Sequence, residues 1–233
     1  MDGQKGMDEV TIKAIARLYG AFPQKFGIPR QSNIVEDIVS KVVFEPEFRN
    51  AEALRGIEDY DYIWLIWRFS ENEQVQWSPM VRPPRLGGNR RMGVFATRSS
   101  FRPNGLALSS VRLVDVELHS ADGPVLYVAG ADLMDGTPIY DIKPYLPYTD
   151  AHPGVRSGFA ATPSERLLEV VCAPELLAKV DENLRGPLCE VLANDPRPSY
   201  HHNSEREYGM DFYGYNVRFK VLEDNILDVI NIF

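Results

Sequence analysis

Cysteine is scarce in this sequence, with only Cys172 and Cys189 among 233 residues. No histidine cluster with metal-ligand spacing accompanies them, so we expect neither a disulfide framework nor a structural zinc site, and no metal. Long hydrophobic runs are also absent. The longest extends from Ile63 to Trp67, far short of the roughly 20 apolar residues that cross a bilayer. The polar start, MDGQKGMDE, lacks the apolar core of a signal peptide. We therefore expect a cytoplasmic protein that makes no membrane contact.

Acidic residues are absent between Glu73 and Asp115, although the whole chain has a formal net charge of -8. The cations of this stretch are all arginines: Arg82, Arg85, Arg90, Arg91, Arg98, Arg102 and Arg112. A guanidinium group forms forked hydrogen bonds with phosphate or carboxylate. We therefore expect residues 81–113, the arginine segment, to bind an anionic ligand. The overall acidity argues against indiscriminate nucleic-acid binding, which needs a broad basic face.

The chain is 44% hydrophobic, enough to bury a core. Strand-like runs are predicted at Val10–Leu18, Ile38–Phe44, Tyr60–Phe69, Met92–Thr97, Leu108–Leu118 and Val125–Ala131. The run Tyr60–Phe69 is almost wholly apolar, which predicts a strand buried on both faces. Asp135 and Gly136 favour a tight turn. Because a helical period hardly occurs before Pro163, the pattern indicates a largely antiparallel barrel or sandwich.

The predicted domain organisation follows from changes in composition along the chain. Residues 1–9 are expected to form a flexible tail, residues 10–160 the β domain, and residues 161–233 a small C-terminal α+β domain. The stretch 143–158 is rich in proline, which stiffens a linker. A helix is predicted over Pro174–Leu192, interrupted at Gly186 and Pro187. A terminal hairpin is predicted from Tyr215–Val221 and Ile226–Ile232.

Some candidate residues allow a second interpretation that needs no function. Arg90 and Arg91 are explained equally well as solvated charges. Four other arginines lie beside proline, glycine or small hydroxyl residues in loops, which favours a functional role: Arg82, Arg85, Arg98 and Arg102. Three aspartates in the stretch ADLMDGTPIYDIKPYLPY are as consistent with a polar hairpin as with a site: Asp132, Asp135 and Asp141. The GGNRRMG stretch does not match GxGxxG, so a dinucleotide fold is not favoured.

Several phrases occur in an order that is more specific than any single motif. They are KFGIPRQ, ALRGIEDYDYIWLIWRF, VRPPRLGGNRRMGVFATRSSFRPN, DLMDGTPIYDIKPYLP, DPRPSY and YNVRF. Together they resemble the TrmO (TsaA-like) family, the tRNA N6-threonylcarbamoyladenosine methyltransferases. The resemblance implies a mainly β protein, with an antiparallel N-terminal β-barrel that binds S-adenosylmethionine and a small C-terminal α+β domain. It also implies a homodimer that methylates the N6 atom of threonylcarbamoyladenosine, next to the anticodon of tRNA.

The family's motifs also imply particular site residues. The cofactor site would include Gln31, Ser32, Asn33, Ser70, Glu71, Arg98, Leu108, Asp132, Leu133, Met134 and Asp135. The acceptor nitrogen has a delocalised lone pair, so its proton must be removed, by Asp135 or Tyr140. Arg98 and Arg102 are expected to bind the carboxylates of the donor and of the modified base. The tRNA anticodon stem-loop would contact Lys25, Arg30, Arg82, Arg85, Arg197 and Tyr200.

One stretch departs from the family pattern. The family commonly reads RPNPIGLS, whereas this chain has Gly105, Leu106 and Ala107 in place of Pro-Ile-Gly. A proline-to-glycine change frees the backbone, and a glycine-to-alanine change disfavours positive φ. Two alternatives therefore stay open: an S-adenosylmethionine-binding sensor, and a methyltransferase with a different acceptor.

Overall fold

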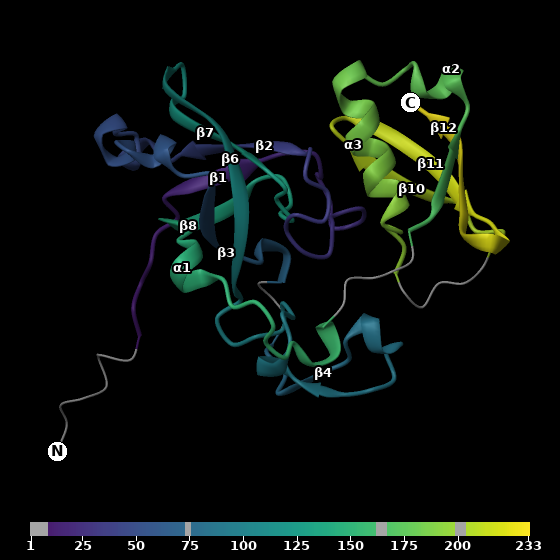
Figure 1. Ribbon diagram of the computed structural model, residues 1–233, viewed down its shortest axis with the longest axis horizontal. Coiled ribbons are helices and arrows are strands. Elements are labelled where there is room, and N and C mark those ends of the chain that lie inside the picture. The colour runs from purple at the N-terminus through teal and green to yellow at the C-terminus, as the bar shows by residue number, and fades with distance from the viewer. Residues whose placement is uncertain (1–8, 73–75, 162–166, 199–203) are drawn as a thin grey trace.

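A computed structural model describes residues 9–72, 76–161, 167–198 and 204–233. Six strands close into an antiparallel barrel, drawn on the left of Figure 1. In hydrogen-bonded order they are β1 (Ala16–Tyr19), β2 (Val39–Phe44), β7 (Gly123–Ala129), β6 (Leu106–Ser120), β3 (Tyr62–Arg68) and β8 (Thr137–Pro144), which pairs with β1. The mainly β fold with an N-terminal antiparallel barrel is thus confirmed.

Strand β3 shows how the barrel core forms. Successive side chains of a strand point to opposite faces, and Ile63, Leu65 and Trp67 are buried in the barrel. The alternate residues Tyr62 and Trp64 are only half-buried on the outer face, where both rings contact Tyr145. The prediction that this strand is buried on both faces was therefore wrong, because its outer side chains face other aromatic rings and solvent.

Two predicted strands are much shorter than the sequence pattern indicated. The first begins only at Ala16, and Val10 and Ile12 before it are exposed. Of Met92–Thr97, only β5 (Met92–Gly93) is a strand, and it pairs with β4 (Met80–Val81). Val94 N donates to Pro79 O at 3.0 Å beside this pairing, and the chain then forms a 3-10 turn, Val94–Ala96. An alternation of apolar and polar residues therefore does not by itself mean that a segment pairs with another strand.

The C-terminal domain is a four-stranded sheet covered by helices (Figure 1). Its order is β10 (Tyr208–Phe212), β11 (Tyr215–Val221), β12 (Ile226–Ile232) and β9 (Glu169–Cys172), with β9 parallel to β12. The helices are α2 (Pro174–Leu177) and α3 (Glu182–Ala193), and α1 (Pro147–Asp150) follows β8 in the chain. The predicted β11–β12 hairpin is confirmed.

The predicted interruption of the C-terminal helix lies at the wrong place. The helix breaks between Leu177 and Glu182, whereas Pro187 lies inside α3. A residue before proline is disfavoured in a helix partly because its Cβ meets the proline ring. Gly186 has no Cβ, so α3 continues through the pair.

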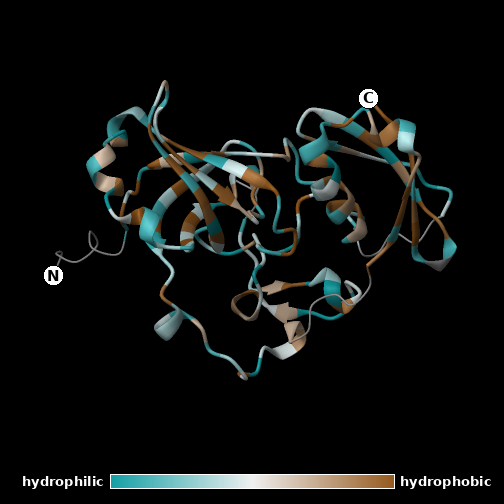
Figure 2. Ribbon diagram, turned by 45° about the horizontal axis from the view of Figure 1, so that its top comes forward, coloured by the Kyte–Doolittle hydropathy of each residue, from teal (hydrophilic) through white to brown (hydrophobic). Residues whose placement is uncertain are grey.

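Two hydrophobic cores are present, and the apolar residues follow the strands of both sheets (Figure 2). The first fills the barrel. The second lies between the C-terminal sheet, α3 and the β1–β2 loop (residues 20–38), which contributes Phe22, Val35 and Ile38. This loop appears in purple between the two domains in Figure 1. The division of the chain near residue 160 stays a prediction, and the β1–β2 loop lies in the second core although it precedes that point.

Within the described residues, no helix is both long and apolar enough to cross a membrane.

Candidate active site

A chain of hydrogen bonds leads from the barrel core to a carboxylate. Trp67, at the end of β3, donates from Nε1 to Ser109 Oγ at 3.0 Å. Ser109 on β6 is 2% exposed, and its hydroxyl donates to Asp132 Oδ1 at 2.6 Å. Trp67 and Ser109 come from neighbouring strands of the barrel, because β3 pairs with β6 and Trp67 lies opposite Ala107. Asp132 is thereby held at one defined place beside the barrel core.

The electrostatic surroundings of Asp132 are unusual for a carboxylate. Burial raises the pKa of Asp132 above its usual value, because removal from water disfavours the charged form. The hydrogen bond from Ser109, the charge of Arg98 and the Ser32 backbone amide each act in the opposite direction. A carboxylate that is costly to keep charged and lies near an arginine is typical of a ligand site.

The β1–β2 loop brings a second predicted group to the same place. Arg98 donates from Nη1 to Gln31 Oε1. Asn33 donates from Nδ2 to the carbonyl and the hydroxyl of Ser110, at 3.0 and 3.2 Å, and from its backbone N to Gly130 O at 2.8 Å. The structure thus gathers Gln31, Ser32, Asn33, Arg98 and Asp132 around the Ser109–Ser110 part of β6.

The rest of the DLMD stretch is divided between core and turn. Leu133 is buried in the barrel core, and Met134 O accepts from Thr137 N at 3.2 Å. Asp135 Oδ1 accepts the Gly20 N–H at 2.9 Å, where the β1–β2 loop begins. Within the described chain no donor contacts Asp135 Oδ2. The Gly20 contact therefore orients the carboxylate and leaves Oδ2 without a donor in that part of the chain.

Three further predicted cofactor residues lie on the segments that flank this group. Ser70 and Glu71 begin the 3-10 turn after β3, and Phe69 N beside them donates to Gly105 O at 3.0 Å. Leu108 is 50% exposed on the outer face of β6, opposite Ile66. No hydrogen bond among the described residues joins these three side chains to Asp132 or Arg98.

The other predicted catalytic residues are positioned differently. Arg102 donates from Nη1 to Thr97 O at 3.2 Å and to Ser99 O at 3.4 Å, so it braces its own loop. Tyr140 lies in β8 where the register against β3 shifts between Ile66 and Trp67. A bulge of this kind re-aims a side chain. No hydrogen bond of the Tyr140 hydroxyl occurs in the part of the chain that the structure describes.

The predicted RNA-binding residues do not form one cluster. Arg82 and Arg85 are exposed beside the 3-10 turn Pro84–Leu86. Lys25 Nζ lies 3.5 Å from Glu71 O, and Arg30 Nη2 donates to Arg197 O at 3.2 Å. Arg197 itself is 13% exposed and forms a two-point ion pair with Asp195 at 2.8 and 2.9 Å. Tyr200 lies outside the described residues.

Sequence reasoning missed the residues that hold this group in place. Ser109, Ser110 and Gly20 have no local motif that marks them, and the sequence predicts Trp67 only as part of a buried strand. The alternation of β6 does predict that Ser109 points inward, and a serine at a core position is a usable signal because a buried hydroxyl needs a partner.

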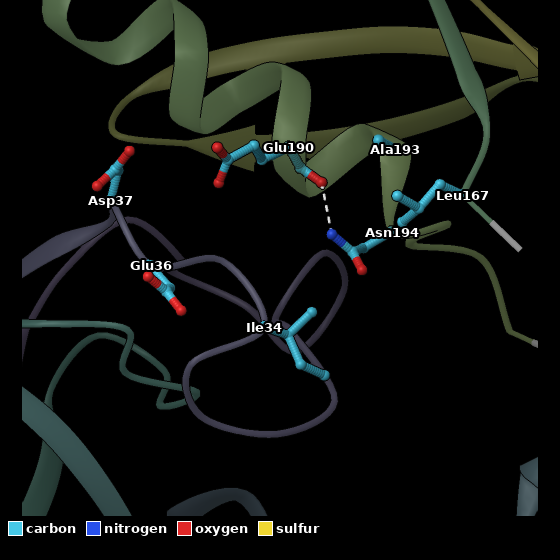
Figure 3. Close-up of a pocket in the computed structure, with 7 residues that line it drawn as sticks. All are labelled: Ile34, Glu36, Asp37, Leu167, Glu190, Ala193 and Asn194. Atoms are coloured by element: carbon cyan, nitrogen blue, oxygen red, sulfur yellow. Dashed lines mark hydrogen bonds between the residues drawn. The ribbon is translucent and has the colours of Figure 1, made fainter. Parts of the chain in front are cut away.

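A separate hollow of about 430 Å³ lies between the β1–β2 loop and the end of α3, lined by Ile34, Glu36, Asp37, Leu167, Glu190, Ala193 and Asn194 (Figure 3). Asn194 is fixed there by a 2.9 Å bond from Nδ2 to Glu190 O. Burial, followed by the charges of Asp37 and Glu36, raises the pKa of Glu190. Three carboxylates repel an anionic ligand, so the hollow does not compete with the arginine-containing group. Among the described residues no cluster suited to a metal ion occurs.

Comparisons with known proteins find relatives over most of the chain. A family model described as the tRNA-methyltransferase O N-terminal domain matches residues 17–151, and one for the TrmO C-terminal domain matches residues 166–233. The tRNA (adenine(37)-N6)-methyltransferase of Escherichia coli K12 is 36% identical over 225 residues, which cover 93% of this chain and 95% of that protein. The protein of the same name from Eikenella corrodens is 45% identical over 163 residues, covering 70% and 91%.

A solved structure supports the same assignment. The crystal structure of TrmO from Pseudomonas aeruginosa superimposes with a TM-score of 0.77 at 28% identity, covering 97% of this chain and 99% of that chain. The two family models together cover the barrel and the C-terminal domain, and the Escherichia coli relative covers both in one protein. The chain belongs to the TrmO family.

Proposed function

We propose that this protein is an S-adenosylmethionine-dependent methyltransferase that modifies the exocyclic N6 of threonylcarbamoyladenosine next to the anticodon of tRNA. The observation that carries the proposal is the convergence of Gln31, Asn33, Arg98 and Asp132, from separate parts of the chain, at one side of the barrel. The names of the relatives cover N6 methylation of adenine 37 in tRNA. The threonylcarbamoyl group goes beyond those names and rests on the resemblance of the motifs.

The charges of the site suit the methyl donor. S-adenosylmethionine carries positive charge at its sulfonium and amino groups and negative charge at its carboxylate, and supplies a methyl group bonded to the sulfonium. The partly desolvated carboxylate of Asp132 complements the positive charge of the donor, and the nearby Arg98 complements its negative carboxylate. Charge-assisted hydrogen bonds of this kind are roughly twice as strong as neutral ones. Leu108, Ser70 and Glu71 would line the rest of the donor site.

For the acceptor, the chain must orient a weakly basic nitrogen and remove its proton. Gly20 N–H fixes one oxygen of Asp135, which leaves the other oxygen as the proposed proton acceptor. Tyr140, at the bulge in β8, is the second candidate for this role. Arg102, braced by two backbone carbonyls, is proposed to face the threonyl carboxylate. Correct positioning of the nitrogen would supply much of the acceleration.

The tRNA is proposed to lie across the arginine segment. Arg82 and Arg85 are exposed there, as is Phe95 at 75%, and Trp77 just before the segment is 52% exposed. Single-stranded nucleic acids bind to surfaces that combine cations with aromatic rings on which bases stack. Lys25 and Arg30 on the β1–β2 loop would extend this surface, with Tyr200 as a further stacking candidate. A homodimer is proposed from the resemblance, and a cytoplasmic location from the scarcity of cysteine.

The test is incubation of the purified protein with S-adenosylmethionine and tRNA that carries threonylcarbamoyladenosine, followed by mass spectrometry of the nucleosides. We expect that nucleoside to gain one methyl group. Arg98→Ala should abolish most of the product, whereas Arg55→Ala, which removes an arginine paired with Glu52 on the barrel surface, should not. Donor binding without any product would count against this acceptor and favour a sensor or another methyl acceptor.

A further inference from the structure

The apolar side chains of the β1–β2 loop pack against the C-terminal domain, and its polar groups form hydrogen bonds with the barrel domain. Phe22 contacts Phe212 edge to face, with ring centroids 5.9 Å apart. Phe26 stacks on Tyr208 at 6.1 Å and on Phe219 at 6.3 Å. These apolar side chains point into the second core, while the polar residues of the same loop reach the barrel. The C-terminal sheet therefore helps to determine the shape of the loop.

Tyr213 joins both ends of this loop. It lies in the turn between β10 and β11 with φ of 47°, a conformation that a bulky residue adopts only when its surroundings hold it. Its backbone N donates to Ala21 O at 2.9 Å, where the loop begins. Its hydroxyl donates to Val39 O, where the loop ends. Burial raises the pKa of Tyr213 to about 12, so the hydroxyl keeps its proton at neutral pH.

Arg197 anchors the middle of the loop. Its guanidinium is held by both oxygens of Asp195, at the end of α3. The carbonyl oxygen of Arg197 accepts from Arg30 Nη2 at 3.2 Å. Arg30 directly precedes Gln31, Ser32 and Asn33. A mostly buried, doubly bonded guanidinium has little reach toward a phosphate, which separates Arg197 from the exposed arginines of the proposed RNA surface.

We propose that Tyr213 and Arg197 are positioning residues for the methyl donor, through which the C-terminal domain shapes the β1–β2 loop and sets donor affinity. When only a fraction of molecules has the competent loop, the apparent affinity falls by that fraction. The inference rests on the proposed function only in taking S-adenosylmethionine as the ligand of this loop. It gives the C-terminal domain a role in donor binding that is separate from any role in RNA binding.

The first test is calorimetric titration of the full-length chain with S-adenosylmethionine, together with tRNA affinity in the absence of donor. Tyr213→Phe removes one hydroxyl, and we expect the donor Kd to rise about 3- to 10-fold, the scale of one lost hydrogen bond. Arg197→Ala keeps the backbone carbonyl that accepts from Arg30 and removes only the guanidinium pair with Asp195, so we expect a rise of at most this size. Neither variant should change tRNA affinity more than about twofold, on the same reasoning.

Matched controls are Tyr148→Phe, whose side chain is 86% exposed, and Arg55→Ala on the barrel; both should leave donor affinity unchanged. An unchanged donor Kd in Tyr213→Phe and Arg197→Ala would overturn the proposal. So would a loss confined to tRNA affinity, which would return Arg197 to the RNA surface. If the wild-type chain binds no S-adenosylmethionine, the proposed function fails too, whereas binding that is equal in all variants defeats this inference alone.

The second test needs no variant and so does not depend on how a variant folds. Hydrogen exchange of the wild-type chain is compared with and without S-adenosylmethionine. Donor binding should slow exchange across residues 21–38 and also at the β10–β11 turn around Tyr213, because a ligand stabilises every contact on which its site depends. Protection confined to barrel residues near Ser109 and Asp132 would contradict a positioning role for the C-terminal domain.

Discussion

At the scale of single residues, Asp132 illustrates how a site is made at the expense of stability. The fold places its carboxylate against the barrel with Ser109 as donor and Arg98 nearby, yet burial still raises its pKa. A carboxyl whose folded-state pKa exceeds its unfolded value costs stability when it is charged. Such costs concentrate at functional sites because the ligand compensates them. Asp135 and Arg102, in contrast, have ordinary hydrogen-bond partners in the backbone.

We predict that Asp132→Asn stabilises the protein while weakening donor binding. At neutral pH the substitution removes a charged, partly desolvated group, so the melting temperature should rise. The gain should shrink as pH falls and vanish below about 4, where the carboxyl of the wild type is neutral in both states. Donor affinity should fall about 10-fold or more, the scale of a hydrogen bond to a charged group. Calorimetric melting across pH and donor titration measure both, and a melting temperature lowered by Asp132→Asn at neutral pH would refute the electrostatic account.

At the scale of elements, the turn that leads into β6 connects the arginine segment to the barrel. Gly105 has φ of +61°, its N donates to Arg102 O at 3.1 Å, and its carbonyl accepts from Phe69. The stretch that departs from the family pattern therefore adopts a left-handed turn at its glycine. Ala107 follows in register with Trp67 and packs against the barrel core. The turn thus fixes the end of β3, where Ser70 and Glu71 begin.

Gly105→Ala should lower the free energy of unfolding by about 1–2 kcal/mol, the cost of a left-handed conformation for a residue with Cβ. Space is not the reason, because the nearest atoms to such a Cβ belong to the flexible Arg68 side chain at 3.7 Å. Gly93→Ala is the control: its φ is -59° with no atom within 4 Å of an added Cβ, so it should stabilise by about 0.4–1 kcal/mol. Urea unfolding measures both, and equal effects would exclude the conformational explanation.

At the scale of the whole molecule, charge is segregated. The chain has a net charge of -8, whereas the arginine segment has no acidic residue. The part of this segment that precedes β6 lies below both domains in Figure 1, around β4. The acidic surface of the rest of the molecule repels RNA, so RNA is expected to bind at the cationic surface of the arginine segment.

The salt dependence of tRNA binding tests this arrangement. Replacing both Arg82 and Arg85 with alanine should lower the slope of log Kd against log salt by about 1.5, since each lost phosphate contact contributes about 0.7 to 0.9. Donor affinity should not change. Fluorescence anisotropy with labelled tRNA over a salt series measures the slope, with Arg156→Ala, also exposed but outside the segment, as the control. An unchanged slope in the double variant would remove these arginines from the RNA surface.

Much of the fold follows from local pattern in the sequence. The alternation around Val111 in β6 and the two apolar runs of the β11–β12 hairpin predict strands because period-two burial is a local property. The same rule failed at Val10 and Ile12, which alternate but have no partner strand within the described residues. The predicted break at Pro187 was also wrong, since the preceding Gly186 has no Cβ to clash with the proline ring.

By itself the sequence determined many of the strands, the separation of charge and, through ordered motifs, the family. Only the tertiary structure decided what surrounds Asp132. Arg98 and Gln31 are 67 residues apart in the chain and meet through their side chains, and Tyr213 reaches Val39 from the other domain across 174 residues. Such contacts depend on how the two domains pack against the β1–β2 loop. No local period encodes them, because the free energy that selects them comes from burial shared between distant segments.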